Sequence, residues 1–106
     1  PKLEPEYVYE TIARNVAYME VRISKSVQLS FDVTDKQMQI AINPHLFDWV
    51  MENLLKNAID AMNGEGKIMI SAFKNGKWIH IDIKDTGSGI PKNKFETIFE
   101  PGYSTK

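Results

Sequence analysis

An apolar stripe between residues 47 and 62 restricts the possible folds of this chain more than any other feature. Its members recur at intervals of three and four residues: Phe47, Val50, Met51, Leu54, Leu55, Ala58, Ile59 and Met62. This spacing predicts a long amphipathic helix with one face buried against other elements. Asn43-Pro44 supplies an N-cap with a proline in the first turn, and Asn63-Gly64 supplies a typical helix end.

The segments on both sides of this helix predict further regular elements. They are a helix at residues 5–19, strands at residues 27–33 and 38–42, strands at residues 67–73 and 78–82 or beyond, and a short helix or loop-helix at residues 91–99. Asn75-Gly76 is a strong hairpin signal between two of the strands. The order αββαββ with antiparallel hairpins predicts a two-layer α/β sandwich, with the helices packed on one face of a mixed sheet.

Size and composition indicate one ordinary globular domain. The chain has 106 residues, and its 13 basic and 14 acidic residues leave a net charge of -1, which predicts neither a nucleic-acid partner nor contact with a membrane. It has no cysteine, and no apolar run approaches the ~20 residues of a membrane span, which together favour a cytoplasmic location. Because the chain begins at Pro1 without a methionine, we expect a fragment of a longer protein.

Polar side chains form a second stripe on the long helix. Asn53, Asn57 and Asp60 fall within an arc of roughly 60°, away from the apolar face. Such residues can simply be solvated. However, asparagine is a poor helix former, so two asparagines four residues apart lower the stability of the helix without an evident structural benefit. Amide and carboxylate oxygens at this spacing could hold a hydrated Mg²⁺, so the stripe indicates a metal-nucleotide site.

A glycine-rich turn follows the apolar positions of the last predicted strand. In the segment from Asp85 to Gly89, the glycines Gly87 and Gly89 would let a flat ligand approach the backbone. The Asp85 carboxylate could accept a hydrogen bond from an exocyclic amine such as that of adenine. A plain glycine-rich loop is the alternative. The segment is neither a Walker A motif nor a dinucleotide-binding fingerprint, because the residues that those motifs require are absent.

Together these motifs resemble those of the Bergerat-fold ATP-binding domains, the superfamily of gyrase, Hsp90, histidine kinases and MutL. The resemblance is closest to the catalytic domain of the sensor histidine kinases. Residues 53–61 are similar to the N box of that family, residues 85–89 to its G1 box, and residues 95–101, running on to 104–106, to its F box. Three motifs in this order are specific, and the resemblance covers about residues 5–106.

The resemblance implies that the bound cofactors are ATP and Mg²⁺. It implies that Asn57 coordinates the Mg²⁺ on the phosphates, with Asn53 beside it. Lys56 and Asp60 would flank the nucleotide.

For the base, the resemblance implies that Asp85 binds the adenine amine and that Gly87 and Gly89 shape the pocket around it. Phe95 and Phe99 would anchor the start of a lid over the nucleotide, and plain apolar packing is the alternative for these two side chains.

One position separates the branches of this superfamily. The ATP-hydrolysing members carry a glutamate, the general base for water, four residues before the metal-binding asparagine, and Asn53 occupies that position here. An amide does not accept a proton at neutral pH, and Glu52 lies about 100° further round the helix. The resemblance therefore implies phosphoryl transfer to a protein acceptor rather than hydrolysis.

Two departures from the family pattern define what we expect of the fragment. The second glycine box and the closing strand and helix would lie beyond Lys106, so residues 1–106 are expected to be a single partial domain. Neither His45 nor His80 lies in the sequence context of a phosphoacceptor. We therefore expect weak nucleotide affinity and no autophosphorylation by the fragment alone.

The resemblance also implies partners and a setting. It implies a bacterial two-component kinase that phosphorylates a histidine on the dimerisation domain of the same protein and serves a response regulator, with this domain in the cytoplasm. Three alternatives stay open: a Bergerat-fold ATPase, a protein-serine kinase of the anti-sigma type, and a degenerate fold that serves only as an interaction module.

Overall fold

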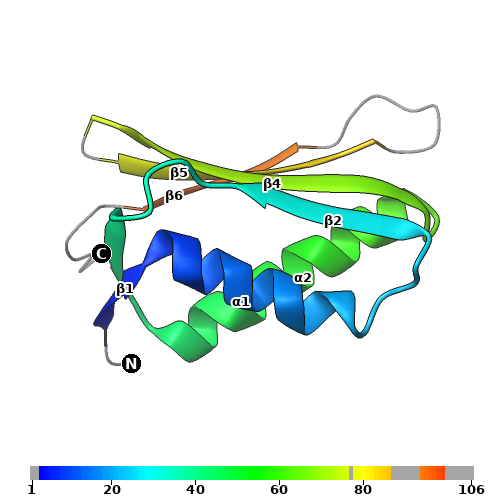
Figure 1. The fold of residues 1–106 in the computed structure, drawn as a ribbon, viewed down its shortest axis with the longest axis horizontal. Coiled ribbons are helices and arrows are strands. Elements are labelled where there is room, and N and C mark those ends of the chain that lie inside the picture. Colours follow the sequence, from blue (N-terminus) through cyan, green and yellow to red (C-terminus); the bar gives the residue numbers. More distant parts are fainter. Residues whose placement is uncertain (1–2, 77, 87–93, 100–106) are drawn as a thin grey trace.

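The chain folds into two layers, with two helices under one face of a four-stranded sheet (Figure 1). The computed structural model describes residues 3–76, 78–86 and 94–99, the last of these as backbone only. Helices α1 (Val8–Glu20) and α2 (Pro44–Ala61) lie side by side against the sheet, and no described helix covers its other face. The predicted α/β architecture, with helices on one face of a mixed sheet, is confirmed.

The sheet has the strand order β2-β4-β5-β6. Its strands are β2 (Val27–Asp32), β4 (Gly66–Asn75), β5 (Trp78–Asp85) and β6 (Lys94–Phe99). The pair β2–β4 is parallel, because the chain crosses back through α2 between them, and the other two pairs are antiparallel. Asn75 pairs with Trp78, so the predicted hairpin is confirmed, and Gly76 has a φ of +64° in its loop.

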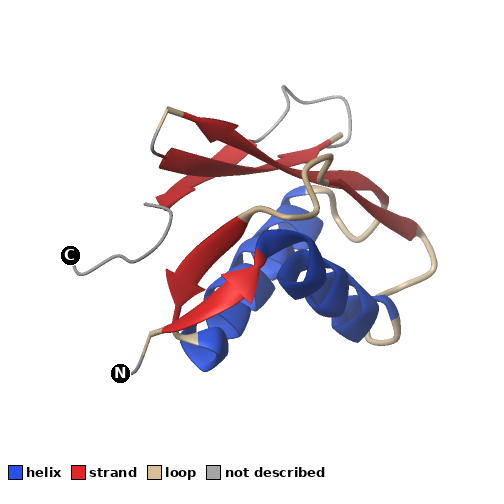
Figure 2. Ribbon diagram, turned by 60° about the vertical axis from the view of Figure 1, so that its left-hand side comes forward, coloured by secondary structure: helices blue, strands red, loops and turns tan. Residues whose placement is uncertain are grey.

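The first segment of the chain corrects two predictions. The helix predicted from residue 5 begins at Val8, because residues 4–7 form strand β1 (Glu4–Tyr7). The hairpin predicted between residues 27–33 and 38–42 is also absent. Strand β3 (Gln39–Ile42) instead pairs with β1 in a small separate sheet, visible apart from the large sheet in Figure 2. Both differences arise because β1 and β3, which are distant in the sequence, pair with each other. No local sequence pattern indicates this pairing.

The predicted short helix at residues 91–99 is wrong over the described part of that segment. Residues 94–99 form β6 on the edge of the sheet, where Phe95 pairs with Ile83 and Phe99 pairs with Ile79. Aromatic and β-branched residues favour a strand, and the hydrogen bonds with β5 stabilise this segment as a strand rather than a helix. Residues 91–93 and 100–106 lie outside the described residues, as do the side chains of Phe95 and Phe99, so the anchoring of a lid stays a prediction.

Helix α2 has the ends that its sequence predicts. At the start, the Asn43 side-chain oxygen accepts a hydrogen bond from the Leu46 N–H at 2.9 Å. At the end, Asn63 adopts the left-handed conformation with a φ of +57°, and Gly64 follows with a φ of +81°. The Gly64 N–H donates to the Ile59 carbonyl at 3.0 Å, which closes the last turn in a Schellman arrangement. The two ends therefore fix the length of α2.

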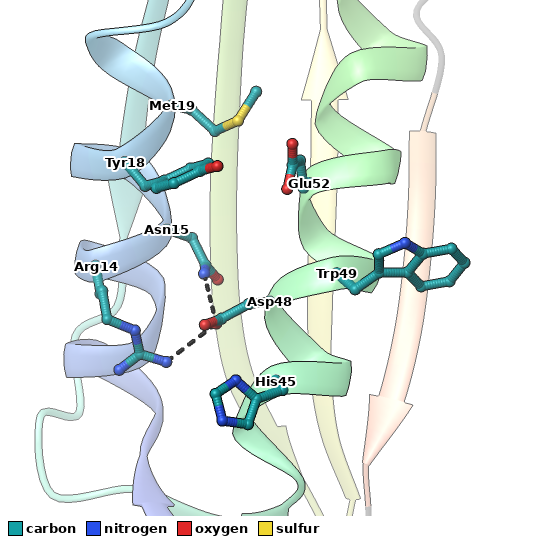
Figure 3. Close-up of a pocket in the computed structure, with 8 residues that line it drawn as sticks. All are labelled: Arg14, Asn15, Tyr18, Met19, His45, Asp48, Trp49 and Glu52. Carbon is teal, nitrogen blue, oxygen red and sulfur yellow. Dashed lines mark hydrogen bonds and ion pairs between the residues drawn. The ribbon is translucent and has the colours of Figure 1, made fainter.

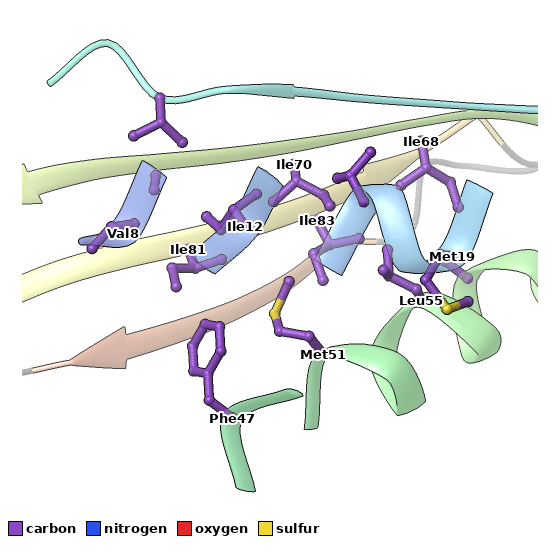
Figure 4. Packing of buried hydrophobic residues seen from close by; sticks show 14 of the residues in the cluster. Val8, Ile12, Met19, Phe47, Met51, Leu55, Ile68, Ile70, Ile81 and Ile83 are labelled. Atoms are coloured by element: carbon purple, nitrogen blue, oxygen red, sulfur yellow. The ribbon is translucent and has the colours of Figure 1, made fainter. Parts of the chain in front are cut away.

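The hydrophobic core lies between the sheet and the two helices (Figure 4). Met51 and Leu55 of α2 face the isoleucines of the central strands, and Leu55 is fully buried. On β5 the inward positions alternate along the strand: Ile79, Ile81, Ile83 and then Asp85. The fourth position of this inward series is therefore a carboxylate.

Candidate functional site

Asp85 ends β5 on the same face as the core isoleucines, and only 2% of its surface is exposed. Neither oxygen of its carboxylate has a hydrogen-bond partner among the described residues. An unpaired buried carboxylate costs several kcal/mol. A group that donates hydrogen bonds to Asp85 would offset that cost, so this carboxylate has the properties of a ligand-binding group. The other predicted residues of this turn, Gly87 and Gly89, lie outside the described residues and stay predictions.

The end of β5 lies against the end of α2. The Thr86 hydroxyl is 3.8 Å from the sulfur of Met62, the residue that caps α2. Asn57 lies five residues before Met62, which is about 7.5 Å along a helix axis. The structure therefore brings the base-binding candidate close to the helix that carries the phosphate-binding candidates.

Asn53 and Asn57 are both exposed on α2, as the polar stripe predicts. The Asn53 amide nitrogen donates to the Trp49 carbonyl at 2.7 Å, which satisfies one donor and leaves its oxygen as an acceptor. The Asn57 side chain makes no hydrogen bond within the described part of the chain. Its amide oxygen is therefore available to a ligand or a hydrated cation.

Lys56 and Asp60 lie on the α1 side of the polar stripe of α2. Both line a groove of about 480 Å³ that also contains Arg22 and Ile23, at the end of α1. The Lys56 ammonium lies 3.1 Å from the Glu52 carboxylate. Asn53 and Asn57 do not line this groove. Asp60 therefore belongs both to the polar stripe of Asn53 and Asn57 and to the edge of this groove, and the contacts of Lys56 and Asp60 with a nucleotide stay a prediction.

A second cavity, of about 300 Å³, lies between α1 and α2 (Figure 3). One oxygen of Asp48 accepts hydrogen bonds from Arg14 at 3.0 Å and from Asn15 at 2.9 Å, so this carboxylate joins the two helices. His45 lines the same cavity and is exposed. Sequence reasoning missed this inter-helix contact, because α1 and α2 are distant in the sequence.

Neither histidine lies beside Asp85. His80 is half-buried, and its ring stacks on Phe73 with 5.1 Å between the centroids. It occupies the opposite face of β5 from the core isoleucines, since it alternates with Ile79 and Ile81. Both histidines therefore lie away from the core-facing end of β5.

The described residues contain no cluster of three or more histidines, aspartates or glutamates that could hold a metal ion by themselves. A cation at α2 would thus depend on amide oxygens and on groups of a bound ligand. No helix in the described ranges is long and apolar enough to span a membrane.

Comparisons with known proteins identify the family of this chain. Residues 42–106 match the family described as "Histidine kinase-, DNA gyrase B-, and HSP90-like ATPase". Sensor histidine kinase ZraS of Escherichia coli K12 is 34% identical over 83 residues, covering 78% of this chain and 18% of ZraS. Sensor protein CreC of the same organism is 34% identical over 110 residues, covering 97% of this chain and 23% of CreC. The chain therefore spans about a fifth of the length of these relatives.

Solved structures show the same fold. The catalytic domain of histidine kinase ThkA superposes with a TM-score of 0.75 at 22% identity, covering 86% of this chain and 63% of that chain. ThkA in complex with the response regulator protein TrrA superposes with a TM-score of 0.72, covering 84% of this chain and 27% of that chain. The family match over residues 42–106 shows that the chain belongs to the histidine kinase-, DNA gyrase B- and HSP90-like ATPase family.

Proposed function

We propose that this chain is the ATP-binding part of the catalytic domain of a bacterial sensor histidine kinase. In the whole protein it would hold Mg-ATP and present the γ-phosphate to a histidine on another domain. The observation that carries the proposal is the carboxylate of Asp85, which is buried on the inward face of β5 and has no hydrogen-bond partner among the described residues. The named sensor kinases among its relatives, ZraS and CreC, support the choice of this branch.

Asp85 would accept a hydrogen bond from the exocyclic amine of adenine. Desolvation strengthens such a bond, because a charged acceptor in a buried site has no competing water. An adenine would also supply the donor that the described residues do not supply to this carboxylate. A base without the amine would leave the carboxylate unpaired. Gly87 and Gly89 are proposed to let the base approach the backbone.

Asn57 would hold the Mg²⁺ that accompanies the nucleotide. The exposed amide fits that role, because Mg²⁺ prefers oxygen ligands and keeps several waters and phosphate oxygens around it. When bound, the ion would supply charge neutralisation at the phosphates. The side chains of this chain would contribute orientation, which accounts for much of the catalysis in phosphoryl transfer.

Asn53 supports transfer rather than hydrolysis. It stands one helical turn before Asn57, its nitrogen donates to the Trp49 carbonyl, and an amide does not accept a proton at neutral pH. Glu52, the neighbouring carboxylate, pairs with Lys56 on the side of α2 that faces α1. Water beside the phosphates would therefore lack a general base from these residues.

The proposed partners are the phosphoacceptor domain of the same protein and a response regulator. The similarity to ThkA, whose structure includes the response regulator TrrA, supports this assignment. We also propose that residues 1–106 form a single partial domain and that the domain acts in the cytoplasm.

The proposal is tested with the intact protein, γ-labelled ATP and Mg²⁺. We expect label on a histidine of the protein, recognised because that phosphate is lost in acid and stable in base, together with slow release of free phosphate. Rapid steady-state hydrolysis without a labelled protein would identify an ATPase instead. Acid-stable label on serine would identify a serine kinase. A protein that does not bind Mg-ATP would have only an interaction role.

A further inference from the structure

Thr86 ends the pairing between β4 and β5 in an unusual way. Its N–H donates to the Lys67 carbonyl at 3.1 Å, which extends the register of the Ile68–Asp85 pair by one residue. In a regular antiparallel pair, the Lys67 N–H would donate back to the Thr86 carbonyl. Here it donates to the Thr86 hydroxyl oxygen, also at 3.1 Å. The Thr86 hydroxyl thus replaces the Thr86 carbonyl as the acceptor of the Lys67 N–H, and the regular pairing of β4 with β5 ends here.

The same hydroxyl also contacts the end of α2. It lies 3.8 Å from the sulfur of Met62, so the hydroxyl can accept from Lys67 and donate its proton to this sulfur. Gly66 makes the approach possible. A Cβ at Gly66 would lie 2.7 Å from both the Met62 sulfur and the Thr86 oxygen, and its φ of +141° also disfavours other residues. We refer to Met62, Gly66, Lys67 and Thr86 as the Thr86 cluster.

The Thr86 cluster matters because it helps to hold the backbone that orients the Asp85 carboxylate. The Asp85 carboxylate makes no hydrogen bond to the described residues, so its direction depends on the backbone on either side. On one side, β5 pairs with β4 up to Ile68. On the other side is Thr86, whose Cα lies about 3.8 Å from that of Asp85. The backbone N–H and the hydroxyl of Thr86 both form hydrogen bonds with Lys67.

We infer that Thr86 is a positioning residue for base recognition. Its hydroxyl ties the peptide after Asp85 to the start of β4 and the end of α2, and this holds the carboxylate where it can meet the exocyclic amine of adenine. The inference rests on the proposed function of Asp85. It extends that function, because it makes selectivity for adenine depend on a side chain that need not touch the base.

The test compares two nucleotides on the intact protein by titration calorimetry with Mg²⁺. One is ATP, and the other is purine riboside triphosphate, which lacks the exocyclic amine. The ratio of their dissociation constants measures recognition of the amine. A hydrogen bond to a charged group makes this ratio about tenfold or more in the unmodified protein. In Thr86→Val, we expect ATP to bind about tenfold more weakly and the analogue to change by less than about twofold.

Three further variants serve as controls. Thr86→Ser keeps the hydroxyl and should retain the original ratio. Ser71→Ala removes a hydroxyl from the opposite face of β4, since Ser71 alternates with the buried Ile70 and Ala72, and it should change neither constant. Gly66→Ala displaces the Thr86 hydroxyl without removing it and should reduce the ratio, as Thr86→Val does.

An equal loss of affinity for both nucleotides in Thr86→Val would mean a general structural role and would overturn the inference. If Thr86→Val does not fold, an unchanged ratio in Gly66→Ala overturns it equally. Asp85→Asn distinguishes a failure of the proposed role of Asp85 in base binding from a failure of the proposed role of Thr86 in positioning. An unchanged ratio in Asp85→Asn would refute the proposed role of Asp85, whereas a reduced ratio there with an unchanged ratio in Thr86→Val would refute the positioning role alone.

Discussion

Replacing Asp85 by asparagine should stabilise the nucleotide-free protein while weakening nucleotide binding. The Asp85 side chain is 2% exposed, and both of its oxygens are without partners in the described part of the chain. A buried unpaired charge costs several kcal/mol, and a buried unpaired amide costs about 1–3 kcal/mol. Because the amide has nearly the same shape, Asp85→Asn should raise the free energy of unfolding by about 1–3 kcal/mol.

The measurement is thermal unfolding, followed by circular dichroism, with and without Mg-ATP. A gain of 1 kcal/mol corresponds to roughly 4–8 °C in Tm for a domain of this size. Without nucleotide the variant should therefore melt several degrees above the unmodified protein. With nucleotide the order should reverse or the gap should close, because a ligand at free concentration L stabilises the folded protein by RT ln(1 + L/Kd), which is larger for the protein that binds it more tightly.

Asp48→Asn is the matched control for this experiment. The Asp48 carboxylate has two described partners, Arg14 and Asn15, so its neutralisation should lower stability or leave it unchanged. A nucleotide-free Asp85→Asn protein that melts below the unmodified protein would show that the carboxylate is stabilised within the protein, and the reasoning from its burial would be refuted. Unchanged affinity for ATP by calorimetry would remove Asp85 from the site.

Three other substitutions test the helix that carries the site. Asn57→Ala should abolish Mg²⁺-dependent phosphorylation in the intact protein with the circular dichroism spectrum unchanged, and normal phosphorylation would refute the metal role. Leu55→Ala empties a fully buried position and should lower the free energy of unfolding by about 2–5 kcal/mol in denaturant titrations; a loss below that range would mean that the core collapses around the cavity. Asn43→Ala removes the side-chain acceptor of the Leu46 N–H and should cost about 1 kcal/mol in the same titrations, whereas no loss would mean that water satisfies the helix end equally well.

The parts of the fold that local chemistry determines could be predicted from the sequence. Helix α2 is the clearest case, because its apolar period, its Asn43 cap and its Asn63-Gly64 end all agree. The pairing of β1 with β3 could not be predicted, since it joins Glu4 to Ile42 and neither segment carries a signal for the other. Strand β6 was missed for a similar reason, because its structure depends on β5.

The candidate site divides in the same way. The alternation along β5 places Asp85 on the inward face, and the α2 period places Asn57 outside, so both positions follow from sequence spacing. The Thr86 cluster does not follow from spacing. Its contacts join the end of α2, the start of β4 and the end of β5, and only the folded chain brings Met62, Gly66 and Thr86 together.

The parallel pairing of β2 with β4 has a consequence for the order of folding. Val27 must find Gly66 across the whole of α2, so closing this pair carries a large loop entropy and should occur late. The β4–β5 hairpin closes over a two-residue loop and can form within microseconds. Strand β5, which carries Asp85, should therefore pair with β4 early in folding. Helix α2, which carries Asn57, should pack against the sheet only when the slower pairing of β2 with β4 is complete.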